Sequence, residues 1–325
     1  MKYFIAGGAG FIGSHLATTI CRESPRSKIV IYDNFSSGCL WHLDPVKKNK
    51  NLRIVRGDIK NSVKLASAIK GADVVYHFAS NPDISRAMTE PDIDFWEGTF
   101  LTHQILEAMR KNGVPTILYA SGSGVYGDTG LKRINENYSP MRPISTYGAS
   151  KLAGEAMMSS YLGMFGIQGA AFRFANVVGP HQTHGVGYDF VKNLIRNPRR
   201  LEILGNGYQS KPYIHVGDVI AALRLVESRV KGFSCYNVAT RDAVTVRQIA
   251  GLAIKALGLR KVRLIYQGGD RGWKGDVPVV RLDSQAIRRL GWKDQYSSRQ
   301  AVRLAIQSMI SDARMKKFDW TRSLR

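Results

Sequence analysis

The sequence predicts an α/β fold with a doubly wound parallel sheet and a smaller C-terminal α/β lobe. A glycine-rich turn, Gly7–Gly13, lies between a short apolar strand and a helix. Further short apolar runs follow, which are typical of strands buried on both faces of a parallel sheet. The runs are Lys2–Ala6, Lys28–Tyr32, Leu52–Val55, Asp73–Ala79 and Pro115–Tyr119. A chain of 325 residues can bury a large core and divide into two lobes.

The first turn has the spacing of a dinucleotide-binding turn of the Rossmann type. Gly7, Gly10 and Gly13 fit the pattern G-x-x-G-x-x-G, and Gly8 with the last two fits G-x-G-x-x-G. Because glycines lack a Cβ, the backbone can approach a pyrophosphate, whose charge is met by the amides at the helix N-terminus. The strand before the turn and the helix after it supply the context that a lone glycine pattern lacks.

Acidic residues follow the second and third strands. Asp33 would accept hydrogen bonds from the adenosine ribose, and its charge would repel a 2′-phosphate, which favours NAD over NADP. It could instead only cap the next loop. Asp58 could meet the adenine amino group, and the small residues after the fourth strand could line the centre of the cofactor. Both positions also suit ordinary turns.

The stretch Ala120–Gly127 and the following Tyr147-Gly-Ala-Ser-Lys151 carry the chemistry. A tyrosine four residues before a lysine lies on the same helix face, so the ammonium can favour the ionised phenol. Tyr147 is therefore the candidate general base. The same spacing also arises by chance, with a buried tyrosine and a solvated lysine. The dinucleotide turn earlier in the chain favours the catalytic interpretation.

Several motifs together resemble one family. They are Gly7–Leu16, Asp33-Asn34, Gly57-Asp58, His77–Ala79, Val125–Gly127, Tyr147 with Lys151, Arg173–Pro180, Lys211–Asp218 and Asp270–Asp276. In this order they look like the extended short-chain dehydrogenase/reductase family, and within it the NAD-dependent nucleotide-sugar epimerases and dehydratases. The likeness covers nearly the whole chain and is closest to UDP-glucose 4-epimerases.

The resemblance implies a role for individual residues. Tyr147 would be the base, Lys151 would hold the nicotinamide ribose and lower the pKa of the tyrosine, and a sugar hydroxyl would be oxidised transiently to a keto group. The implied NAD contacts are Gly7, Gly10, Phe11, Ile12, Gly13, Asp33, Asn34, Ser36, Gly38, Asp58, Ile59, Phe78, Ala79, Ser80, Tyr147 and Lys151. The implied substrate contacts are Asn176, Val186, Lys211, Arg271 and Asp276.

Two positions depart from the family pattern. Relatives usually carry Ser or Thr three residues before the valine of V-Y-G, where this chain has Gly122; Ser121 or Ser123 could replace the missing donor, and Ser123 is the expected one. Phe95 stands where many relatives carry asparagine. The segment also lacks the acid and base of the T-D-E-V-Y-G dehydratases, so a dehydratase is disfavoured. Another nucleotide-sugar reductase or epimerase, or an impaired NAD-binding protein that binds nucleic acid, stays open.

The expected dinucleotide domain is 1–176 with 213–239 returning to it, and the expected substrate lobe is 177–212 with 240–325. Three scattered cysteines predict neither disulfides nor a metal site, and a cytoplasmic protein is expected. The net charge of +22 could attract nucleic acid or an acidic membrane surface, but neither partner is favoured. The family likeness implies a UDP-sugar substrate and a homodimer. The tail, with Phe318 and Trp320, is expected to be a solvated terminus.

Overall fold

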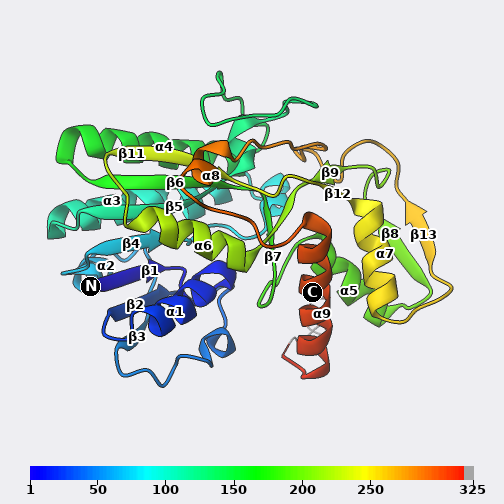
Figure 1. Cartoon of the computed structure of the whole chain (residues 1–325), viewed down its shortest axis with the longest axis horizontal. Coiled ribbons are helices and arrows are strands. Elements are labelled where there is room, and N and C mark those ends of the chain that lie inside the picture. Colours follow the sequence, from blue (N-terminus) through cyan, green and yellow to red (C-terminus); the bar gives the residue numbers. More distant parts are fainter. Residues whose placement is uncertain (318–325) are drawn as a thin grey trace.

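A seven-stranded parallel sheet forms the centre of the molecule in the computed structural model, which describes residues 1–317 (Figure 1). The strand order is β11-β6-β5-β4-β1-β2-β3, and every neighbouring pair is parallel. The strands are β1 (Lys2–Ala6), β2 (Lys28–Asp33), β3 (Leu52–Arg56), β4 (Val74–His77), β5 (Thr116–Gly122), β6 (Gln168–Phe174) and β11 (Phe233–Val238). The predicted doubly wound α/β fold is confirmed.

Helices cover both faces of this sheet. One face packs against α2 (Ser62–Ile69), α3 (Phe100–Asn112) and α4 (Thr146–Phe165), and the other against α1 (Phe11–Glu23) and α6 (Val216–Glu227). Successive residues of β1 divide between the two cores: Phe4 belongs to the first and Ile5 to the second. Because side chains alternate along a strand, burial of both faces requires the continuous apolar runs seen in the sequence.

The smaller lobe has its own hydrophobic core. Buried side chains of three helices meet there, with Leu194 from α5 (Val186–Arg196), Ile249 from α7 (Val246–Ala256) and Ile306 from α9 (Ser298–Arg314). Short strand pairs surround it: β7 (Asn176–Val178) with β10 (Tyr213–His215), β8 (Arg200–Ile203) with β13 (Arg263–Tyr266), and β9 (Ser210–Lys211) with β12 (Val244–Thr245). The short helix α8 (Gln285–Arg289) lies beside β11. The smaller lobe is thus also α/β, as expected.

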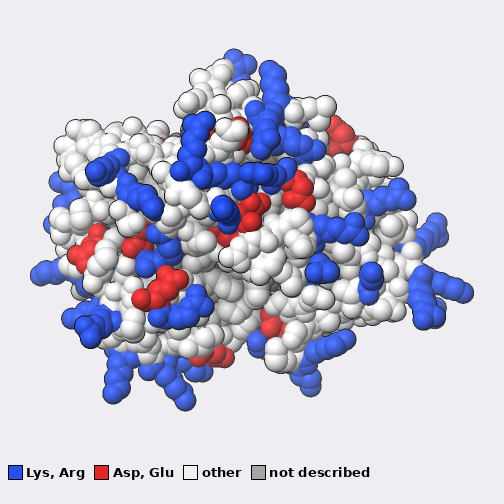
Figure 2. Space-filling view, viewed as in Figure 1, with Lys and Arg blue, Asp and Glu red and all other residues white. Residues whose placement is uncertain are grey.

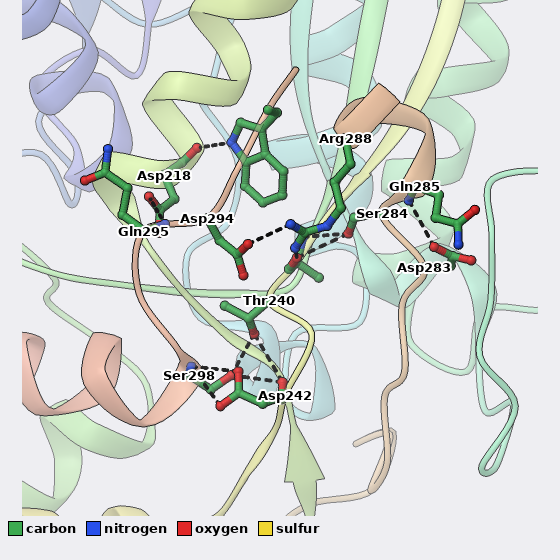
Figure 3. Close-up of polar contacts among 12 residues, drawn as sticks. Asp218, Thr240, Asp242, Asp283, Ser284, Gln285, Arg288, Asp294, Gln295 and Ser298 are labelled. Carbon is green, nitrogen blue, oxygen red and sulfur yellow. Dashed lines mark hydrogen bonds and ion pairs between the residues drawn. The ribbon is translucent and has the colours of Figure 1, made fainter. Parts of the chain in front are cut away.

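Polar contacts join the segments that connect the two lobes. Figure 3 shows Thr240 and Asp242, which follow β11, pointing to Ser298 at the start of α9. The Thr240 and Ser298 hydroxyls are 2.7 Å apart, and the Ser298 amide donates to Asp242 at 2.9 Å. Because the chain returns to the main sheet at β11 and then enters the smaller lobe again through β12 and α7, the lobes are interleaved. The proposed domain boundaries stay a prediction.

Strand β5 is longer than the expected Pro115–Tyr119: it continues through Gly122, because Ala120 to Gly122 pair with Phe172 to Phe174 of β6. A π-helical turn, η3 (Phe95–Thr99), leads into α3. Helix α9 begins after Ser297, which forms a capping box with Gln300. The tail residues Phe318 and Trp320 lie outside the described residues.

Basic side chains cover much of the surface. Figure 2 shows Lys and Arg over both lobes on the visible face, with fewer acidic residues between them. Among residues 1–317, no helix is both long and apolar enough to cross a membrane.

Candidate active site

The carboxyl ends of β1 to β5 bring the predicted cofactor and catalytic residues to one edge of the sheet. Ligands of open α/β sheets bind at this edge, where the connections diverge. Each group of predicted residues follows its own strand: Gly7 to Gly13 after β1, Asp33 to Gly38 after β2, Asp58 and Ile59 after β3, Phe78 to Ser80 after β4, and Gly122 and Ser123 at the tip of β5.

The glycine turn is shaped by the absence of side chains. Gly7 has φ +74°, and a Cβ there would lie 2.7 Å from the Ala79 amide nitrogen. A Cβ on Gly13 would lie 2.4 Å from the Gly7 carbonyl oxygen. Helix α1 begins after Gly10, which offers no side-chain cap, and its first turn contains no acid. Its first amides are therefore left for an anion such as a pyrophosphate.

Asp33 holds the neighbouring loops together. Its carboxylate is 7% exposed and accepts hydrogen bonds from the amides of Ala9 at 2.9 Å and Phe35 at 2.8 Å. Burial raises the pKa of Asp33, and these two bonds oppose the rise. A Cβ on Gly38 would lie 2.9 Å from an Asp33 oxygen. Asp33 thus does cap a loop, the alternative weighed from the sequence; contact with the ribose stays a prediction.

The loops after β2 and β3 are joined by polar contacts. The Asn34 side-chain amide donates to Asp58 at 3.3 Å, and the Ser36 amide donates to Asn34 at 3.0 Å. After β4, the Ser80 hydroxyl is buried without a hydrogen-bond partner in the described part of the chain. An unpaired buried hydroxyl costs free energy unless a ligand or water meets it. These residues fit a bound dinucleotide. The first amides of α1 would bind its pyrophosphate, and Ser80 would contact the central part of the cofactor.

Tyr147 and Lys151 lie on one face of α4, as the spacing predicts. The Lys151 ammonium is 5.4 Å from the centre of the Tyr147 ring and 4.9 Å from that of Tyr119, and the lysine is 2% exposed. Burial, followed by the charge of Asp94, raises the pKa of Tyr147 to about 12. Burial lowers the pKa of Lys151 to about 7 against the charge of Asp94. Burial and the charge of Asp94 thus set the phenol pKa in this structure, and the expectation that the ammonium lowers it stays a prediction.

The tip of β5 faces the Tyr147 ring. A Cβ on Gly122 would lie 4.0 Å from Tyr147 Cε1 and would meet nothing closer, so this is the space left by the missing side chain. Ser121 is 4% exposed and donates to Glu155 at 2.6 Å. Ser123 opens the short 3₁₀ turn η4 (Ser123–Tyr126), and its hydroxyl has no hydrogen-bond partner within residues 1–317. Of the two candidate serines, Ser121 already donates its hydroxyl proton to Glu155, whereas the Ser123 hydroxyl can still donate to a ligand.

The predicted substrate cations are brought together, each beside a carboxylate. Lys211 forms an ion pair with Asp276. Arg271 donates to the Asp276 backbone carbonyl at 2.7 Å and to the Asp128 carboxylate at 2.6 Å. Asn176 lies in β7, where its partner is Tyr213, and Val186 begins α5. These five predicted residues occupy the smaller lobe and the strand that leads into it.

Sequence reasoning missed the supports of the site. The Ala9 carbonyl accepts a hydrogen bond from His42 at 2.8 Å, and the His42 ring stacks on that of His181 at 4.7 Å. The His15 ring also stacks on that of His181, with the ring centres 4.8 Å apart. Burial, then the charges of His15, His42 and Lys317, lowers the His181 pKa to about 3. No spacing pattern signals these histidines, because they come from three separate segments.

Replacing Gly13 by Ala should weaken NAD binding by at least about 10-fold, since the new methyl would force the glycine turn apart. Isothermal titration calorimetry with NAD would measure the change. The matched control is Gly163→Ala in α4, where a Cβ meets nothing within 4 Å. That variant should bind NAD like the parent; equal binding by Gly13→Ala would show that the turn does not hold the cofactor.

Comparison with known proteins agrees with this geometry. Residues 3–239 match the NAD dependent epimerase/dehydratase family. A putative UDP-glucose 4-epimerase from Methanocaldococcus jannaschii is 29% identical over 95% of this chain and 99% of its own. A dTDP-D-glucose 4,6-dehydratase from Mus musculus is also 29% identical, over 94% of this chain and 88% of its own.

Solved structures include both kinds of enzyme. A UDP-galactose 4-epimerase superposes with a TM-score of 0.85 at 36% identity, covering 96% of this chain and 99% of its own. A dTDP-glucose 4,6-dehydratase from Streptomyces venezuelae, with NAD bound, superposes with a TM-score of 0.89 at 26% identity. The match covers 97% of this chain and 98% of the dehydratase chain. The match over most of the chain, together with the glycine turn and the Tyr147–Lys151 pair, places this chain in the NAD-dependent epimerase/dehydratase family, with NAD as its cofactor.

Proposed function

We propose that this protein is a nucleotide-sugar 4-epimerase of the UDP-glucose/UDP-galactose type. The observation that carries the proposal is the tip of β5, where Gly122, Ser123 and Gly124 face the catalytic helix without a carboxyl group. Elimination of water from a sugar requires an acid and a base beside the reacting carbons. Epimerisation requires removal of a hydroxyl proton and a hydride, and return of the hydride to the opposite face of the keto sugar, with no acid–base pair for elimination. The described site therefore favours epimerisation.

The residues of the chain supply proton transfer and orientation. Tyr147 would take the proton of the sugar hydroxyl and return it when the keto group is reduced. Bound NAD supplies the hydride acceptor and, in the reverse step, the donor. Because the pKa of Tyr147 is about 12 in the protein alone, the phenol must be made more acidic for catalysis near neutral pH. A charged Lys151 beside it acts in that direction.

Lys211 and Arg271 would bind the diphosphate of the substrate. Both belong to the smaller lobe and already have carboxylate partners, Asp276 and Asp128. Phosphate oxygens can replace carboxylate oxygens as acceptors for these cations, and arginine can hold them in a bidentate contact. Asn176 and Val186, where the chain enters this lobe, would contact the sugar nucleotide.

The decisive assay incubates the purified protein with UDP-glucose, UDP-galactose, their N-acetyl and uronic forms, and dTDP-glucose, and separates the products. We expect interconversion of a pair of 4-epimers without loss of water. Tyr147→Phe should abolish conversion while NAD binding persists, because only the proton acceptor is removed. A product lighter by one water would identify a dehydratase instead, and unchanged turnover by Tyr147→Phe would refute its role as base.

Ser123 is proposed to donate a hydrogen bond to the reacting oxygen. Ser123→Ala should lower kcat on the order of 10²-fold, as loss of one such donor does. Adding Gly122→Ser to that variant should restore at least about 10-fold, because a side chain at 122 points toward the Tyr147 ring. Steady-state kinetics on the identified sugar pair would measure both. Unchanged kcat in Ser123→Ala would remove Ser123 from the mechanism.

We further propose that a second copy of the chain covers α3 and α4. Large apolar side chains are exposed beside these helices, with Phe95 51% and Trp96 45% exposed on η3, which leads into α3, and Met164 72% exposed near the end of α4. The Trp96 ring contacts Phe95 at 5.0 Å and Phe100 at 5.4 Å, so the exposed aromatic residues form one group. Exposed aromatic groups of this kind mark interaction surfaces.

Sedimentation velocity should therefore give the mass of a dimer for the parent protein and of a monomer for Trp96→Glu, which places a charge in the apolar contact. Leu131→Glu is the control, since Leu131 is 81% exposed on a different loop. It should remain dimeric. A monomeric parent protein would refute the proposed contact.

A further inference from the structure

Asp94 is a buried carboxylate beside the catalytic helix. The residue immediately precedes η3, and it is 1% exposed. One carboxylate oxygen accepts a hydrogen bond from the Asn81 side-chain amide at 2.9 Å, and the other accepts from the Thr146 hydroxyl at 2.7 Å. Asn81 belongs to the loop after β4, and Thr146 is the first residue of α4, next to Tyr147. Asp94 therefore joins three chain segments at the start of the catalytic helix.

The π-helical turn accounts for the inward direction of Asp94 beside the exposed Phe95 and Trp96. A π turn contains one residue more than an α turn and therefore rotates the residues before it relative to those after it. Phe95 and Trp96 are directed to solvent. The turn itself is fixed against α4, because a Cβ on Gly98 would lie 2.7 Å from the Ser150 hydroxyl, which donates to the Tyr147 carbonyl at 2.8 Å.

The charge of Asp94 acts on a buried cation that has few other partners. Lys151 forms no ion pair with a carboxylate in residues 1–317; Tyr119, Tyr147 and His77 are its other titratable neighbours. The nearest acid along the same helix, Glu155, is bound to Arg173. Burial lowers the Lys151 pKa, and Asp94 is the charge that opposes this change.

We infer that Asp94 is a positioning residue of the site: its carboxylate holds the first turn of α4 against the loop after β4, and its negative charge favours the ammonium form of Lys151 on the same helix. The consequence for turnover rests on the proposed epimerase function, but the effect on Lys151 does not. The two effects on Lys151 are opposite in sign, so removing the anion leaves burial unopposed. Lys151 then loses its proton at a lower pH.

The direct test is a ¹³C NMR titration of the Lys151 side chain, with the signal assigned by Lys151→Arg. In Asp94→Asn the titration midpoint should fall by about 1 pH unit, the size expected for loss of a nearby opposite charge. Thr146→Val is the matched control, because it removes one hydrogen bond and leaves the carboxylate charged. Its midpoint should stay at the parent value. An unchanged midpoint in Asp94→Asn, or an equal fall in Thr146→Val, would overturn the inference.

The pH profile of kcat gives the functional readout. The alkaline limb should move to lower pH in Asp94→Asn and stay in place in Thr146→Val, a difference that a merely structural role would not produce. If the chain has no epimerase activity, the NMR titration still decides the inference.

If Asp94→Asn is too unstable for a pH titration, the thermal midpoints of this variant and of a double variant decide the question. Asp94→Asn combined with Lys151→Met removes both charges, so it should recover most of the thermal midpoint lost in the single variant. No recovery would show that Asp94 does not act on Lys151.

Discussion

The buried ion pair between Glu155 and Arg173 holds the catalytic helix on the sheet. The two side chains are 4% and 3% exposed, and the Arg173 Nη2 lies 2.7 Å from a Glu155 oxygen. Glu155 lies one turn after Lys151 on α4, and Arg173 belongs to β6. A buried pair of this kind is stable only when both partners are present, and loss of one costs about 3–5 kcal/mol. The pair thus fixes the position of α4 relative to β6.

The same arginine extends the contact to the loop that faces the site. Its Nη1 donates to the Tyr126 hydroxyl at 2.8 Å, and that hydroxyl donates to Asn237 of β11 at 2.8 Å. Tyr126 ends η4, the turn that begins with Ser123. One buried network therefore positions both the helix with Tyr147 and the turn with Ser123. Ser121 belongs to the same network, because its hydroxyl donates to Glu155.

The sequence was most informative where a residue's role follows from its own chemistry. The strands were predicted because both of their faces are apolar, and the glycine turn because its spacing is tied to a required backbone conformation. The end of β5 was missed, because Ser121 and Gly122 are polar or small and only their pairing with β6 makes them strand. The π turn at Phe95 was missed for a similar reason: it depends on the close contact between Gly98 and Ser150, which come from distant segments.

The site was predicted as a set of residues but not as an electrostatic environment. The spacing of Tyr147 and Lys151 gave their common face, whereas the pKa of each depends on burial and on Asp94, 53 positions before Tyr147 in the chain. The grouping of Lys211, Arg271 and Asp276 was anticipated from the family likeness. Their arrangement as ion pairs was not, because Asp128 reaches Arg271 from the loop after η4.

These ion pairs have a consequence for selectivity among ligands. Lys211 and Arg271 each pair with a carboxylate, so in their proposed role an incoming anion would displace a carboxylate instead of meeting an unpaired cation. The gain in free energy is then the difference between two anionic partners, which is smaller than the full attraction of either. On a protein with a net charge of +22, these ion pairs would make the proposed diphosphate site discriminate against the other anions that the surface attracts. They would also favour product release, since the carboxylates re-form their ion pairs as the product leaves.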